Sequence, residues 1–147
     1  MKRIITTVFA ALFLMVAETK ATELVPVTIM QTFFETFTGA QNVQWEQKNG
    51  FNIASFTLNN VKQSAVYSED GELIVVARQI GQNEISAKLD ADLKERFEGF
   101  YATTIFEMKE GSTTDYFATV TNGSKEKILK ANGNKWVVLK EKSIAGM

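Results

Sequence analysis

Apolar residues recur at helical spacing in two segments of the chain, residues 24–39 and 86–98. The first stripe consists of Met30, Phe33, Phe34 and Phe37, and the second of Ile85, Leu89, Leu93 and Phe97. Gly39 and Gly99 follow these stripes, and glycine is a common residue just beyond the C-terminus of a helix. The pattern therefore predicts two helices, each with one apolar face.

Each predicted helix is followed by four short segments that favour strands, separated by residues that tolerate the positive φ of tight hairpin turns. The turn signals include Asn49-Gly50, Asn59-Asn60, Asp70-Gly71, Asn122-Gly123 and Asn132-Gly133. The predicted strands cover residues 42–48, 51–58, 61–68, 72–80, 101–109, 115–121, 125–131 and 135–141. Consecutive strands joined by hairpins predict an antiparallel meander.

The two halves of this pattern, residues 24–80 and 83–141, can be laid over each other. Phe33, Phe37 and Gly39 match Leu93, Phe97 and Gly99 at an offset of 60. We interpret this match as an internal duplication of a helix-plus-four-strand unit. The predicted fold class is α+β, with one antiparallel sheet and both helices on one face. Residues 72–80 are apolar on both faces, which predicts a central strand, whereas the charges of residues 125–131 predict an edge strand or a solvent-facing one.

The N-terminus has the pattern of a secretory signal peptide over residues 1–21. Lys2 and Arg3 precede an apolar stretch at residues 4–17, and Thr19-Lys20-Ala21 offers small residues for cleavage. The apolar stretch is shorter than the roughly 20 residues that cross a bilayer. We therefore expect a mature domain at residues 22–147 that has no stable membrane anchor and is periplasmic or secreted.

Composition removes several classes of function. The 147 residues include neither cysteine nor histidine, which excludes thiol nucleophiles, disulfides, Cys/His zinc sites and imidazole-based triads. Sixteen basic residues are balanced by seventeen acidic ones, so no basic surface for nucleic acid is expected. We predict no cofactor, no metal site, no catalytic residue and no enzyme activity.

Several motifs along the mature chain resemble the PepSY-like, beta-lactamase-inhibitor-like proteins of Gram-negative bacteria. They are Phe33-x-x-x-Phe37-x-Gly39, Asn42-Val43-x-Trp45, the run from Phe51 to Phe56, Tyr67-Ser68-x-Asp70-Gly71 and Phe97-x-Gly99-Phe100. Ile85-Ser86 departs from the Leu-Pro that commonly opens the second helix of the family. The resemblance implies a small secreted or periplasmic protein, and it supplies no catalytic residue. The family name implies a concave sheet, which grips a hydrolase in one distant relative.

Aromatic residues on the predicted strands are the candidate binding residues. Tyrosine and tryptophan supply rigid contact area at interfaces, and a sheet covered by helices on one face leaves its other face open. The candidate binding residues are Trp45, Tyr67, Tyr116 and Trp136. We expect two or more of them to share this open face and to bind an envelope or secreted protein, as an inhibitor-type module would. Two alternatives are a binder of a small molecule or glycan in the concavity of the sheet, and a hydrolase with a carboxylate pair.

Charged motifs are predicted to be structural. Asp90 and Asp92 are interpreted as surface charge on the second helix, because positions two apart on a helix do not face each other. Residues 69–72 resemble a calcium loop only in their first acidic positions and are interpreted as a hairpin turn. A basic cluster is interpreted as a solvated strand edge, and it consists of Lys125, Lys127, Lys130 and Lys135.

Overall fold

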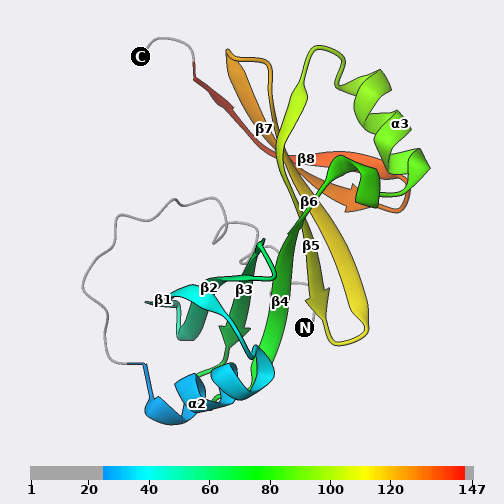
Figure 1. Cartoon of the computed structure of the whole chain (residues 1–147). Coiled ribbons are helices and arrows are strands. Elements are labelled where there is room, and N and C mark those ends of the chain that lie inside the picture. The colour runs from blue at the N-terminus through cyan, green and yellow to red at the C-terminus, as the bar shows by residue number, and fades with distance from the viewer. Residues whose placement is uncertain (1–24, 145–147) are drawn as a thin grey trace.

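The structure of the protein is a computed structural model that describes residues 25–144, so the predicted signal peptide lies outside the described residues. Figure 1 shows the element order, in which a helix and four strands are followed by a second helix and four strands. The elements are α2 (Val27–Thr36), β1 (Gln41–Lys48), β2 (Phe51–Leu58), β3 (Val61–Tyr67), β4 (Leu73–Ile80), the 3-10 helix η1 (Gln82–Glu84), α3 (Ala87–Arg96), β5 (Tyr101–Glu110), β6 (Thr113–Thr121), β7 (Lys125–Asn132) and β8 (Lys135–Ser143). The two helices and eight strands expected from the sequence are all present.

The apolar face of α2 is narrower than the sequence pattern indicated. Ile29 and Phe33 are buried within the helix, and Phe37 is buried directly after it. Phe34 was expected on the same stripe, yet its side chain is 51% exposed. The difference arises because the buried residues follow one another at intervals of four, which leaves Phe34 at the margin of the contact.

Helix α3 begins with a side-chain cap. Ser86 is the N-cap, and its Oγ accepts a hydrogen bond from the backbone N–H of Leu89 at 3.2 Å. Leu89 and Leu93 are buried on the sheet side of the helix, followed by Phe97. The prediction that Phe33, Phe37, Leu93 and Phe97 line the helix–sheet contacts is confirmed.

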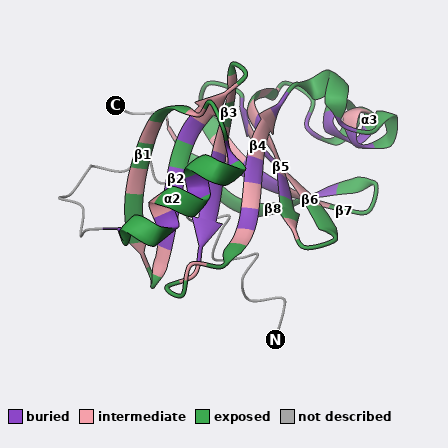
Figure 2. Ribbon diagram, turned by 60° about the horizontal axis from the view of Figure 1, so that its bottom comes forward, coloured by how far each residue is buried: buried purple, intermediate pink, exposed green. Residues whose placement is uncertain are grey.

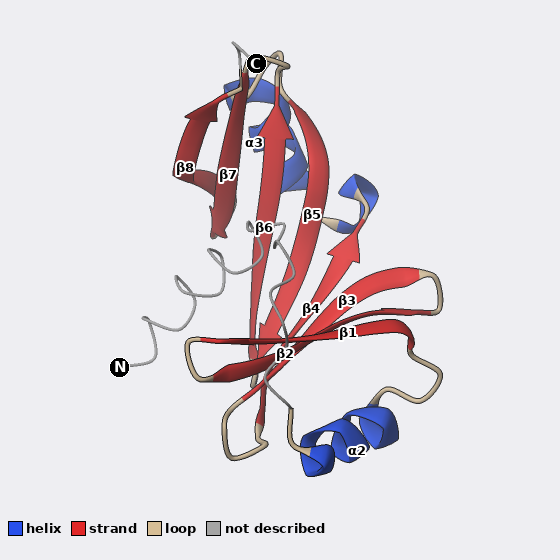
Figure 3. Ribbon diagram, turned by 90° about the vertical axis from the view of Figure 1, so that its left-hand side faces the viewer, coloured by secondary structure: helices blue, strands red, loops and turns tan. Residues whose placement is uncertain are grey.

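The eight strands form one antiparallel sheet in the order of the chain, from β1 to β8. Strand β4 lies in the middle, as its apolar residues predicted, and the edges are β1 and β8. Of the two alternatives for residues 125–131, an edge strand or a solvent-facing one, the edge strand is wrong, because β7 pairs with both β6 and β8. Its lysines are accommodated by cross-strand ion pairs, from Lys130 to Asp115 and from Lys127 to Glu141. Figure 3 shows a twist so strong that β1–β3 run across the direction of β5–β7.

Strand β4 shows that α2 and α3 lie on the same side of the sheet. Val76 packs against the residues beneath α2, and Ile80 packs against those beneath α3. The two positions are four apart on a strand whose pairing runs without a register shift from Val75 to Ile80, so they point to one side. Val75 and Ala77 point to the opposite side, which is called the helix-free side below. Figure 2 shows α2 lying across the strands of the first half, with buried stretches beneath it.

Candidate functional site

The four candidate aromatic residues lie on the helix side of the sheet, in two separate groups. Trp45 and Tyr67 belong to the α2 cluster, the apolar residues between α2 and the sheet, where Trp45 packs 5.2 Å from Phe33 between ring centroids. Tyr116 and Trp136 belong to the corresponding α3 cluster. This placement differs from the expectation that two or more of them would share the open face. The strand register explains this result, because each residue alternates with neighbours that point to the helix-free side.

Trp136 anchors the last strand to α3. Its side chain is 1% exposed, and its indole Nε1 donates a hydrogen bond to the backbone carbonyl of Leu89 at 3.0 Å. Its backbone N–H donates to Asp92 Oδ2 at 2.8 Å, and its carbonyl accepts from Arg96. Arg96 also donates two hydrogen bonds to the Asp92 carboxylate, each of 2.6 Å. Trp136 is therefore a core residue that couples strand and helix.

The interpretation of Asp90 and Asp92 as surface charge is wrong for Asp92. Its carboxylate is buried and holds the backbone of β8, whereas Asp90 pairs with Lys94 on the surface. Hydrogen bonds from Arg96 are the main reason that the pKa of Asp92 falls from 3.8 to about 2, against the opposing effect of burial. Lys94 and Gln82 likewise lower the pKa of Asp90. The shifted carboxyls on α3 are thus explained by structural pairing.

Tyr67 carries a buried hydroxyl group without a hydrogen-bond partner. The residue is fully buried, and its phenolic oxygen is the unsatisfied side-chain atom found among residues 25–144. Burial raises the pKa of this phenol above its usual value of 10.0, so the group stays neutral. The Tyr67 side chain is therefore part of the core, and its hydroxyl contributes no hydrogen bond there.

The lysines of β7 and β8 also differ from the prediction. Lys127 lies over the rings of Phe97 and Phe100, at 5.7 and 4.9 Å from their centroids, and Lys130 lies 5.7 Å from that of Phe117. Cation–π contacts of this kind stabilise a charge that is partly removed from water. Lys127 and Lys125 both pair with Glu141, whose pKa is lowered by these contacts. Three lysines of the basic cluster thus make ion pairs or ring contacts within the sheet, whereas Lys135 is exposed at the start of β8.

The helix-free side of the sheet carries its own apolar cluster, which the sequence analysis did not single out. This helix-free cluster extends from β2 to β6 and consists of Ile53, Val66, Val75, Ala77, Met108 and Phe117. Its members are at most 8% exposed, and the half-buried Phe51 and Ile74 pack against them. The apolar residues on both faces of β4 were the signal in the sequence that could have revealed it.

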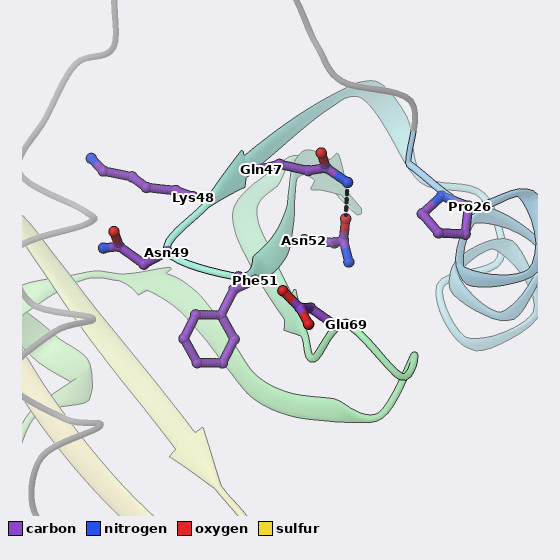
Figure 4. A pocket seen from close by; sticks show the side chains of 8 residues that line it. Pro26, Gln47, Lys48, Asn49, Phe51, Asn52 and Glu69 are labelled. Atoms are coloured by element: carbon purple, nitrogen blue, oxygen red, sulfur yellow. Dashed lines mark hydrogen bonds between the residues drawn. The ribbon is translucent and has the colours of Figure 1, made fainter.

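A hollow of about 450 Å³ lies beside the turn between β1 and β2 (Figure 4). Its walls come from this turn, from Glu69 after β3 and from Pro26 before α2. Gln47 Nε2 donates a 2.8 Å hydrogen bond to Asn52 Oδ1, and Asn52 Nδ2 donates to the Ser68 carbonyl at 3.4 Å. This region, called the hairpin hollow below, is lined by polar groups that adjoin the half-buried ring of Phe51.

Residues 25–144 contain no group of three or more acidic, histidine or cysteine side chains that could hold a metal ion. Neither described helix has the length and apolar character needed to span a membrane.

Comparison with known proteins identifies the fold. No protein-family model matches the chain, and a search of curated proteins gives no match. A BLIP-like protein from Bacteroides fragilis is similar in structure, with a TM-score of 0.64, 14% identity, and coverage of 86% of this chain and 92% of the other. A DUF2874 family protein from Bacteroides ovatus matches over the same shares with a TM-score of 0.67 and 14% identity. A protein from Bacteroides eggerthii, named provisionally as periplasmic, matches with a TM-score of 0.71, 14% identity, and coverage of 83% and 91%. The chain therefore has the fold of BLIP-like and DUF2874 family structures.

Proposed function

We propose that the protein is a non-enzymatic binding module of the periplasm or cell exterior that captures a protein partner on the helix-free side of its sheet. The observation that supports this proposal is the helix-free cluster, whose members are at most 8% exposed and whose accessible margin consists of the half-buried Phe51 and Ile74. An antiparallel sheet with helices on one side commonly presents polar residues on its other side. Here the second side is apolar across five strands, from Ile53 on β2 to Phe117 on β6.

An apolar sheet face is stabilised when a second layer covers it. Helices α2 and α3 form this second layer on the helix side of the sheet, and a partner protein would form it on the helix-free side. Phe51 and Ile74 are the half-buried residues that such a partner would reach first. Ion pairs on the same side, Asp115 with Lys130 and Glu126 with Lys142, would form a polar rim around the contact.

We also propose that the protein is exported and that its chain arose by internal duplication. The pattern at residues 1–21 and the structural similarity to a provisionally periplasmic Bacteroides protein both support export from the cytoplasm. The repeated order of one helix and four strands supports the internal duplication, with units at residues 24–80 and 83–141. Membership of the PepSY-like family rests on the motif resemblance.

Site-specific photo-crosslinking in the native envelope tests the proposed surface. Ser55 is exposed and points to the helix-free side, because it lies between Ala54 and Phe56 of the α2 cluster. Glu35 is exposed on α2 and provides a matched control position. A photoreactive residue at position 55 should give one defined protein adduct that position 35 does not give. An adduct from position 35 alone, or none from position 55, would contradict the proposal.

A further inference from the structure

We propose that the hairpin hollow binds a short, neutral saccharide. The hollow has a volume of about 450 Å³, within the range of roughly 300–1,000 Å³ that is usual for small-molecule sites. It adjoins the surface proposed for a protein partner at Phe51, and neither proposal rests on the other. Three of its eight lining residues carry carboxamides, and the others are one carboxylate, one ammonium group, one aromatic ring, one proline and one glycine.

One hydrogen-bond acceptor in the hollow is held in place by a neighbouring amide. Gln47 uses its Nε2 to donate to Asn52, which is 3% exposed and is braced in turn by the Ser68 carbonyl. Within the described chain, the Oε1 of Gln47 has no hydrogen-bond donor. Figure 4 shows the two amides facing each other, so the Gln47 side chain is oriented before any ligand arrives.

The second acceptor is the Glu69 carboxylate, which lies against the β1–β2 turn. Gly50 has a φ of +79°, and a Cβ atom added there would lie 3.0 Å from Glu69 Oε1. The missing side chain therefore leaves space for the carboxylate beside the turn. Among residues 25–144, Glu69 has neither a hydrogen-bond donor nor an ion-pair partner, so both oxygens can accept from a ligand.

The chemistry of the lining favours a neutral ligand with several hydroxyl groups. Lys48 and Glu69 carry opposite charges, so the lining as a whole attracts neither a cation nor an anion strongly. Neighbouring hydroxyls of a sugar ring can donate to a carboxylate and to an amide oxygen at the same time.

Nuclear magnetic resonance on the isotope-labelled protein tests this site. The probes are chitotriose, cellotriose and maltotriose, each at about 10 mM, which is tenfold above a Kd of about 1 mM. At least one should shift the side-chain amide signals of Gln47 and Asn52 together with the backbone signals of Asn49 and Gly50. No shift with any of the three, or shifts confined to another surface, would overturn the proposal. Trialanine is a comparison ligand, and shifts from this peptide alone would also overturn it.

Two carboxylate variants separate the site from a general effect of charge. Glu69→Ala should weaken binding of the active trisaccharide at least tenfold, because it removes an acceptor from the hollow. Glu72→Ala is the matched control, since Glu72 is an exposed carboxylate in the same loop that does not line the hollow. Unchanged core signals in the spectra would show that both variants are folded. Equal affinities of the two variants would contradict the proposed role of Glu69.

Discussion

The contact between α3 and β8 depends on the Asp92 carboxylate, so Asp92→Asn is the substitution that should separate its charge from its shape. Asparagine retains an oxygen that can accept from the Trp136 backbone N–H, which Asp92 now binds at 2.8 Å. It cannot reproduce the two charge-assisted hydrogen bonds of 2.6 Å from Arg96. The variant should therefore fold and be less stable than the wild-type protein at neutral pH.

The magnitude follows from the pKa of Asp92, which Arg96 chiefly holds at about 2 instead of 3.8. One pKa unit corresponds to about 1.4 kcal/mol, so the shift sets an upper limit of about 2.5 kcal/mol. The Arg96 side chain is 45% exposed, and screening by solvent reduces the expected contribution to about 1–2 kcal/mol. Because the pKa is lower in the folded state, this stability is present above about pH 4 and is lost as the pH falls towards about 2.

Urea denaturation at a series of pH values measures this contribution. The free energy of unfolding of Asp92→Asn should be about 1–2 kcal/mol below that of the wild-type protein at neutral pH, and the difference should shrink as the pH falls through about 2 and vanish below it. Asp90→Asn is the control on the same helix, and it should have a smaller effect because Asp90 pairs with the exposed Lys94. A difference for Asp92→Asn that does not change with pH would refute the assignment to its charge.

Three further predictions concern the core and the turns, and each is measured by chemical denaturation. Phe33→Ala should lower the free energy of unfolding by about 3–5 kcal/mol, because Phe33 is fully buried among aromatic rings, whereas the half-exposed Phe34→Ala should cost much less. Tyr67→Phe should leave the free energy of unfolding unchanged or raise it by up to about 1 kcal/mol, because the substitution removes a buried hydroxyl that has no partner. A clear loss of stability would show that this hydroxyl makes a hydrogen bond. Gly50→Ala should cost more than Gly123→Ala, because both glycines have positive φ and only Gly50 has a carboxylate within 4 Å of the added Cβ.

Much of the fold could be predicted from local patterns. Helical spacing located both helices, and glycine and asparagine located the hairpins, because positive φ is needed there and is observed at Asn49, Asn59 and Asn60. Local sequence did not identify the edge strands. The lysines of β7 form ion pairs with residues on the neighbouring strands, such as Asp115 on β6 and Glu141 on β8. These partners are distant in sequence and come close to the lysines only because the strands pair.

The candidate site was harder to predict than the fold. Register shifts occur in four strand pairings and interrupt the alternation of faces along the chain, and these shifts were not visible in the sequence. Trp45, Tyr67, Tyr116 and Trp136 thus lie beneath the helices, while aliphatic residues and phenylalanine occupy the helix-free side. The hairpin hollow depends on Glu69 approaching the β1–β2 turn, which is a contact between separate hairpins.

The proposed use of the helix-free side is tested most directly by the affinity for the crosslinked partner. Ser55→Arg places a large charge beside the helix-free cluster, and Glu35→Arg places the same side chain on the exposed face of α2. Calorimetry should show binding weakened at least tenfold by Ser55→Arg and unchanged by Glu35→Arg, with both variants as stable as the wild-type protein. Full affinity of Ser55→Arg, or a loss confined to Glu35→Arg, would contradict the account.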